Sequence, residues 1–90
     1  MKIVVLGGSG FLGVHLVREL LSSSKFSLVR VLDVRPYHDF IASFNLGDDL
    51  CNGPRFESMC GSVLDPEDVE RACMGMDGCV HAASLIDFGN

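Results

Sequence analysis

Residues 3–13 read IVVLGGSGFLG, an apolar run that passes directly into a glycine-rich segment. A short, continuous apolar run rich in β-branched residues is typical of a strand that is buried on both faces of a parallel sheet. The glycines can be read as G-x-x-G-x-x-G through Gly7, Gly10 and Gly13, or as G-x-G-x-x-G starting at Gly8. Between a strand and a helix, either spacing predicts a turn that lets the backbone approach a pyrophosphate.

A helix is predicted directly after the glycines, from Phe11 to the serines at 22–24. Its apolar residues recur at helical spacing, which indicates one buried side. The residues predicted to face inward are Leu12, Leu16, Val17, Leu20 and Leu21. The unpaired N–H groups and the positive end of such a helix face the phosphates, so even an acidic chain can bind a dinucleotide there.

A carboxylate follows at the spacing expected for a ribose ligand. Residues 28–32 form a second apolar run, and Asp33 closes it 20 positions after Gly13. An acid at this spacing accepts hydrogen bonds from the adenosine ribose in dinucleotide-binding folds. A glycine turn used only for packing would not predict that acid. Arg35 would favour the 2′-phosphate of NADP, but Asp33 would repel it, so NAD is favoured over NADP.

The rest of the chain continues the alternation of strand and helix. Residues 56–60 predict a third strand, and Asp65 followed by Pro66 and two acids predicts a helix start. The apolar face of that helix comprises Val69, Ala72, Cys73 and Met76, and Asp77-Gly78 is predicted to end it. Residues 79–83 predict a fourth strand, and 34–55 a loop with one short helix.

The expected fold class is therefore α/β, with a Rossmann-type parallel sheet and right-handed crossovers. We expect residues 1–90 to be the incomplete, N-terminal part of a doubly wound NAD(P)-binding domain. The chain is 48% apolar with a mean hydropathy of +0.32, more than a domain this short easily hides. An open edge at the fourth strand would then favour self-association of the isolated chain.

Composition excludes several other classes of protein. A net charge of −5 gives no basic face for nucleic acid. The four cysteines have no C-x-x-C or paired-histidine spacing, which predicts no metal site and free, buried thiols in an intracellular protein on the cytoplasmic side. The N-terminal apolar run meets Gly7 after four residues, too early for a signal peptide or a spanning helix.

The sequence resembles the extended short-chain dehydrogenase/reductase family. The matching segments are LGGSGFLG at 6–13, VRVLD at 29–33, GSVLD at 61–65 and CVHAAS at 79–84. The family opening is T-G-x-x-G-F-L-G, and Leu6 stands in place of its threonine. VRVLD, together with GSVLDPEDVERACMGMDGCVHAASLIDFG at 61–89, looks most like the 3β-hydroxysteroid dehydrogenase/isomerase branch.

The resemblance implies further cofactor contacts. Ser62 stands where the family usually has an aspartate that meets the adenine amino group, and a serine still accepts a hydrogen bond. Ala82 and Ala83 would let the nicotinamide-side ribose approach, or else serve only as packing residues. The expected cofactor-binding residues are Gly7, Gly10, Phe11, Leu12, Gly13, Asp33, Ser62, Val63, Ala82 and Ala83.

No catalytic or metal-binding residue is assigned within these 90 residues. The family transfers hydride with a serine or threonine and a Y-x-x-x-K pair beyond the fourth strand, whereas the only tyrosine, Tyr37, is followed four positions later by Ile41. His81 is expected to be structural. In a full-length protein the resemblance implies NAD-dependent oxidation of a steroid or similar small hydrophobic alcohol. The alternative is a dinucleotide-binding module without chemistry, either a truncated product or a redox-sensing regulator.

Overall fold

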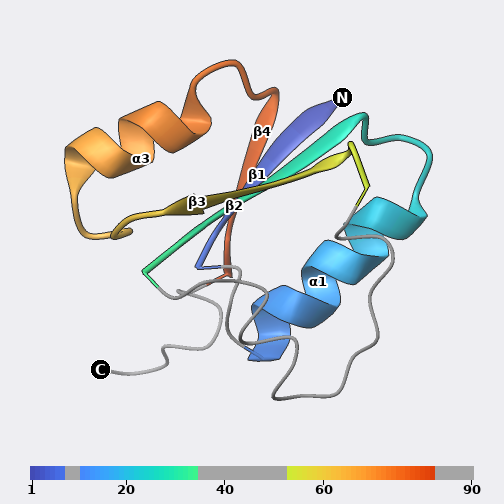
Figure 1. The fold of residues 1–90 in the computed structure, drawn as a ribbon, viewed down its shortest axis with the longest axis horizontal. Coiled ribbons are helices and arrows are strands. Elements are labelled where there is room, and N and C mark those ends of the chain that lie inside the picture. Colours follow the sequence, from blue (N-terminus) through green and yellow to red (C-terminus); the bar gives the residue numbers. More distant parts are fainter. Residues whose placement is uncertain (8–10, 35–52, 83–90) are drawn as a thin grey trace.

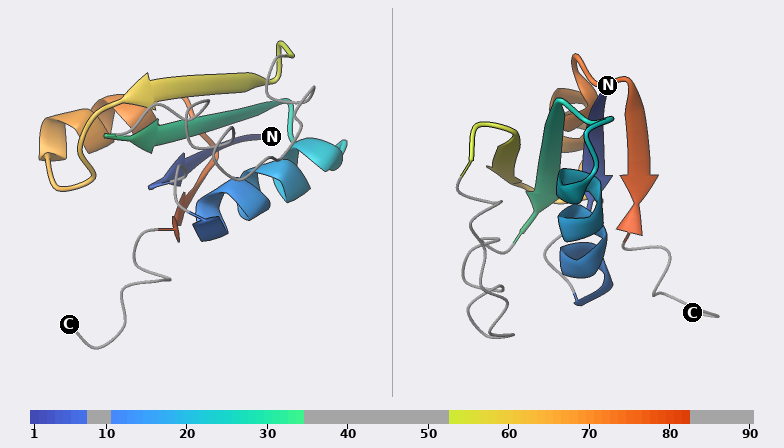
Figure 2. Two further views of the ribbon diagram at one scale, coloured as in Figure 1. Left: turned by 60° about the horizontal axis from the view of Figure 1, so that its bottom comes forward. Right: turned by 90° about the vertical axis from the view of Figure 1, so that its right-hand side faces the viewer.

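The structure, a computed structural model, describes residues 1–7, 11–34 and 53–82. Its elements are β1 (Lys2–Leu6), α1 (Phe11–Ser22), β2 (Leu28–Asp33), β3 (Phe56–Cys60), α3 (Pro66–Cys73) and β4 (Gly78–His81) (Figure 1). The four strands form one parallel sheet in the order β3-β2-β1-β4, which the right-hand view of Figure 2 shows from one side to the other. The predicted α/β fold with a parallel sheet is confirmed, and β1 and β4 lie side by side. The loop with one short helix was predicted for 34–55. Residues 35–52 lie outside the described residues, so that short helix stays a prediction.

The two described helices cover opposite faces of the sheet (Figures 1 and 2). Ile3 and Val5 belong to a buried cluster with residues of α1, whereas Val4 and Leu6 belong to a second cluster with Ala72 of α3. Successive side chains of a strand point to opposite faces, so β1 needs apolar residues at every position once both faces are covered. This explains the uninterrupted apolar run that opens the sequence.

The inward face of α1 differs from the predicted one. Leu12 is 36% exposed, whereas Val14, Val17 and Leu21 are fully buried or nearly so. At about 100° per residue, Leu12 lies about 200° around the helix axis from Val14. The sequence carries apolar residues on more than one side of this helix, and packing against the sheet selects the side that contains Val14.

Both ends of the segment from α3 to β4 are shifted from their predicted positions. The helix ends at Cys73 because Met74 takes up an extended conformation and Gly75 follows with a positive φ of 77°. Strand β4 accordingly starts at Gly78 and ends at His81, whereas 79–83 was predicted. The predicted apolar face of the segment is confirmed, since its members all pack into the cluster on that side of the sheet. Neither described helix is long and apolar enough to cross a membrane.

Two arginines hold the carboxyl ends of the helices. Arg55, which precedes β3, donates hydrogen bonds to the carbonyl oxygens of Leu21, Ser23 and Phe26 at 2.6–3.0 Å. Arg30 of β2 donates to the carbonyl oxygens of Ala72 and Met74 at the end of α3. Its Nε also lies 3.2 Å from a carboxylate oxygen of Glu57, an ion pair without hydrogen-bond geometry. Each guanidinium meets one carbonyl in the last turn of a helix, where no partner within the helix is available, and one or two carbonyls of the segment that follows it.

We expect Arg55→Ala to lower the free energy of unfolding by about 1.5 to 3 kcal/mol, the usual cost of losing hydrogen bonds to a charged group. Arg55→Lys is the matched control, because it keeps the charge but lacks the planar fork that meets several carbonyls at once. Urea unfolding should show little recovery in the lysine variant. Full recovery would mean that charge alone, and not the fork, anchors α1.

Candidate cofactor-binding site

Predicted cofactor residues at the ends of all four described strands lie at one edge of the sheet. All strands run parallel, so the residues at their carboxyl ends share an edge, where open α/β sheets bind their ligands. Gly7 follows β1, Asp33 ends β2, Ser62 lies just beyond β3 and Ala82 follows β4. Gly10 and Ala83 lie outside the described residues, as does the side chain of Phe11.

The turn after β1 begins with a residue that has to be glycine. Gly7 has a φ of 78°, in the left-handed region where residues with a Cβ are strained. Its N–H donates a 2.7 Å hydrogen bond to the carbonyl oxygen of Leu32 in β2. Asp33 is the next residue along β2, so the glycine turn and the predicted ribose ligand are held beside each other.

The amino ends of the two helices differ in charge. The first turn of α1 contains no acidic residue, whereas that of α3 contains Glu67 and Asp68. The N-cap Asp65 of α3 also accepts a 3.0 Å hydrogen bond from the Glu67 N–H. The positive end of α3 is thus already met by its own carboxylates, and of the two described helices α1 is the one suited to a phosphate. Gly13, in the first turn of α1, is buried.

The segment after β3 is tied to Asp33 and to α3. The Gly61 N–H donates to the carbonyl oxygen of Asp33 at 3.0 Å, which extends the pairing of β2 and β3. The Ser62 N–H donates to Oδ2 of Asp68 at 3.0 Å, and the Ser62 hydroxyl accepts from the Leu64 N–H at 3.1 Å. A hydroxyl that accepts one hydrogen bond keeps a second lone pair and its own proton. Ser62 therefore retains the capacity to bond a ligand at this edge.

The carboxylate of Asp68 is stabilised in its charged form. The hydrogen bond from the Ser62 N–H has the largest effect and lowers the pKa of Asp68. Desolvation opposes it, and Arg71, whose Nη2 lies 2.6 Å from Oδ1, lowers the pKa further. A lowered carboxyl pKa stabilises the fold above the ordinary value of 3.8, and that contribution is lost as pH falls through the lowered pKa. The tie between Asp68 and Ser62 is therefore intact at neutral pH.

Two comparisons with known proteins show to which family the chain belongs. A model of the 3-beta hydroxysteroid dehydrogenase/isomerase family matches residues 4–90. The chain belongs to this family. A 3-beta-hydroxysteroid dehydrogenase of Mycolicibacterium neoaurum is 32% identical to this family member over 87 residues, which cover 97% of the chain. The chain spans 20% of the length of that relative. The resemblance seen in the sequence is confirmed.

Two predicted contact residues of this 3-beta hydroxysteroid dehydrogenase/isomerase family member also serve the core. Val63 is half-buried and packs against the cluster on the α3 side, and Ala82 is 1% exposed in the cluster on the α1 side. Ala82 therefore acts as a packing residue, one of the two roles predicted for it. A contact between its backbone and the cofactor stays a prediction. Leu12, in contrast, is exposed near the start of α1.

The cysteines are less buried than predicted. Cys60 and Cys79 are exposed and Cys73 is half-buried; all three are free thiols, and Cys51 lies outside the described residues. His81 is exposed as well. It lies on the same face of β4 as Cys79, the α3 side of the sheet, and α3 packs mainly on β1 and β2. Partial desolvation and the neighbouring Cys73 thiol raise the pKa of Cys79, which disfavours a reactive thiolate.

Among the described residues, no three metal-ligating side chains of His, Cys, Asp or Glu come together.

One residue at this edge was not singled out from the sequence. Asp68 was read only as a favourable acid in the first turn of α3, yet its carboxylate reaches back to the backbone after β3. The signal was its place three residues after the N-cap Asp65, from which a side chain can bond backbone N–H groups before the helix. The sequence alone does not reveal which N–H such a side chain meets.

Proposed function

We propose that this chain is the NAD-binding, N-terminal part of a longer oxidoreductase that oxidises the hydroxyl group of a 3β-hydroxysteroid or a similar hydrophobic alcohol. Three findings support the proposal: the family match over residues 4–90, the printed name of the Mycolicibacterium relative, and the small share of that relative which the chain spans. When bound, NAD supplies the hydride acceptor. The residues described here would hold and orient it.

The single observation that carries the proposal is the junction of β1 and β2. The N–H of Gly7 bonds the carbonyl of Leu32, and Asp33 follows immediately, so a turn with a required glycine and a carboxylate lie at adjacent strand ends. A pyrophosphate at the amino end of α1 would leave its adenosine ribose near Asp33. The same carboxylate would repel a 2′-phosphate, which favours NAD over NADP.

The other contacts follow the same edge of the sheet. We assign the adenine to Ser62 and Val63 beyond β3, since these lie past Asp33 on the side of the sheet away from β1. The nicotinamide end would then extend in the opposite direction, toward β4 and residues 82–83. The substrate and the groups that take up its proton are assigned to the part of the longer protein that follows.

We expect Asp33→Ala to weaken NAD binding by about 1.5 to 3 kcal/mol, the usual value of hydrogen bonds to a charged group. Binding is measured by calorimetry on the longest protein that carries these residues. The control is Glu19→Ala, which removes the same charge from an exposed position of α1 and should leave the affinity unchanged. Equal affinity in the Asp33 variant and the unaltered protein would refute the ribose assignment.

A further inference from the structure

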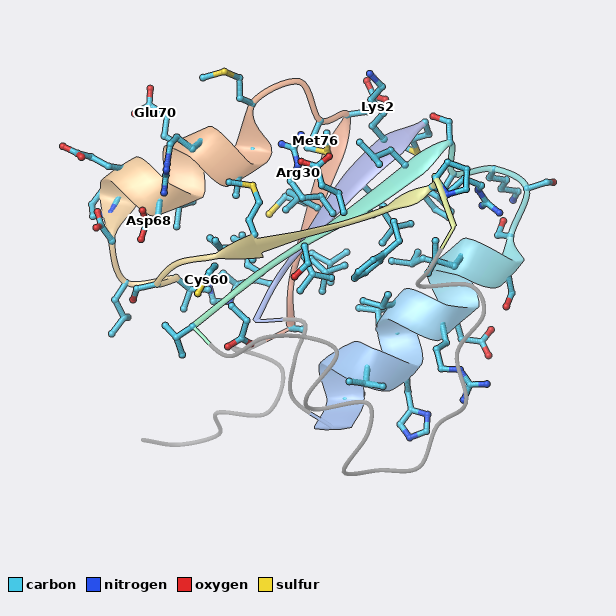
Figure 3. All side chains as sticks on the ribbon, viewed as in Figure 1. Lys2, Arg30, Cys60, Asp68, Glu70 and Met76 are labelled. Atoms are coloured by element: carbon cyan, nitrogen blue, oxygen red, sulfur yellow. The ribbon has the colours of Figure 1, made fainter. Side chains whose placement is uncertain are left out.

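Asp68 lies on the side of α3 that faces the end of β3, whereas Glu70 points away from the sheet (Figure 3). The Asp68 side chain is 21% exposed, and both of its oxygens are engaged. Oδ2 accepts from the Ser62 N–H and Oδ1 from Arg71. A carboxylate held at both oxygens is fixed in orientation, so it can in turn fix the backbone group that it binds.

The backbone around Ser62 is held from several sides. Its N–H is bonded to Asp68, its carbonyl oxygen accepts from the Asp65 N–H at 3.1 Å, and its hydroxyl accepts from Leu64. The preceding Gly61 is bonded to the carbonyl of Asp33. The hydroxyl thus has a defined position, and one lone pair and its proton remain for a hydrogen bond with a ligand.

Gly61 shows how closely Asp68 approaches this segment. A Cβ at residue 61 would lie 2.9 Å from Oδ2 of Asp68, closer than real Cβ atoms come, and 3.0 Å from Cδ1 of Leu32, tighter than most real Cβ contacts. The carboxylate therefore sits directly over the glycine, between the core and the turn. The glycine makes room for Asp68, and Asp68 takes the place that a side chain at position 61 would fill.

We infer that Asp68 is a positioning residue for adenine recognition: through the Ser62 N–H it sets the Ser62 hydroxyl where it accepts a hydrogen bond from the adenine 6-amino group. This inference rests on the proposed NAD binding and adds to it a residue that contacts no part of the cofactor. It also accounts for the serine at a position where the family usually carries an aspartate. A serine side chain is short, so its hydroxyl can bond the amino group only if hydrogen bonds fix the position of its backbone.

The test compares NAD with the analogue in which hydrogen replaces the adenine 6-amino group. An oxo group at that position would not serve, because the Ser62 hydroxyl keeps its own proton and could donate to it. Dissociation constants for both are measured by calorimetry on the longest protein that carries these residues. We expect the unaltered protein to prefer NAD by about tenfold, the value of one hydrogen bond of about 1.4 kcal/mol. In Asp68→Ala this preference should fall to near unity, and in Asp68→Asn, which keeps an acceptor but not the charge, it should be intermediate.

Glu70→Ala is the matched control, because it removes the same charge from the outer side of the same helix and should retain the full preference. Lower affinity for both dinucleotides with an unchanged ratio would overturn the inference, since general destabilisation reduces binding of both alike. An unaltered protein that binds the two equally would overturn it as well. Failure of the unaltered protein to bind NAD at all would instead refute the proposed function, and the inference with it. If Asp68→Ala does not fold, the ratio in Asp68→Asn decides.

Discussion

Replacement of Gly7 by valine is expected to weaken NAD binding by about a hundredfold. At a φ of 78° a side chain costs about 1 to 3 kcal/mol, equivalent to about 5- to 150-fold in affinity if the turn must rearrange to relieve it. A β-branched residue is at the upper end of this range. The rearrangement would break the hydrogen bond to Leu32 and move the amino end of α1, which follows the turn.

The structure offers a control with the same backbone strain. Gly75 has a φ of 77°, and a Cβ there would meet nothing within 4 Å. It follows α3 at the other end of that helix, away from the carboxyl edge of the sheet. Gly75→Val should therefore lower thermal stability to a similar degree but leave the NADH fluorescence titration unchanged. Equal losses of affinity in both variants would show that Gly7 acts only through overall stability.

The purified 90-residue chain is expected to produce no NADH from any secondary alcohol. Hydride transfer from an alcohol requires a group that takes up the hydroxyl proton. These residues contain one tyrosine, Tyr37, with Ile41 where a Y-x-x-x-K pair would place its lysine. The experiment follows NADH absorbance against a heat-treated control, and the longest protein that carries these residues serves as the positive arm.

Two results would change this account in different ways. Turnover by the 90 residues alone would mean that a proton acceptor among them has been overlooked. If the longest protein binds NAD but oxidises no steroid or other secondary alcohol, the alternative of a dinucleotide-binding module without chemistry would replace the proposed activity. Binding and turnover must therefore be measured on the same preparations.

Most of the sheet could be predicted because its signals are local. The run at residues 3–6 and the Asp65-Pro66 helix start are each decided by neighbours in sequence, and both predictions are confirmed. The parallel pairing and the place of β1 beside β4 follow from strands separated by helices and from the order of a doubly wound sheet.

The errors occur where packing between elements decides the outcome. Leu12 and Val14 are both apolar and lie on different sides of α1, and only contact with the sheet determines which one is buried. The exposure of Cys79, which was predicted to be buried, depends on how far α3 extends across the sheet. Such features are set by tertiary packing, which overrides local pattern.

The candidate site was predictable in part for the same reason. Gly7 and Asp33 follow from spacing, and the structure brings them to adjacent strand ends. Asp68 was missed because its role depends on the path of the chain between β3 and α3, which sets its carboxylate against Ser62. Helix periodicity indicates which side of α3 is buried but not which backbone N–H a side chain can reach.

The most direct test of the central claim is an NMR titration of the longest protein that carries these residues with NAD, following backbone amide resonances. Binding at the carboxyl edge of the sheet predicts saturable shifts for the amides of Gly7, Asp33 and Ser62. Amides at the opposite edge, such as those of Lys2, Ser27 and Gly78, should not move. Shifts confined to that opposite edge, or no shifts at saturating NAD, would contradict the account.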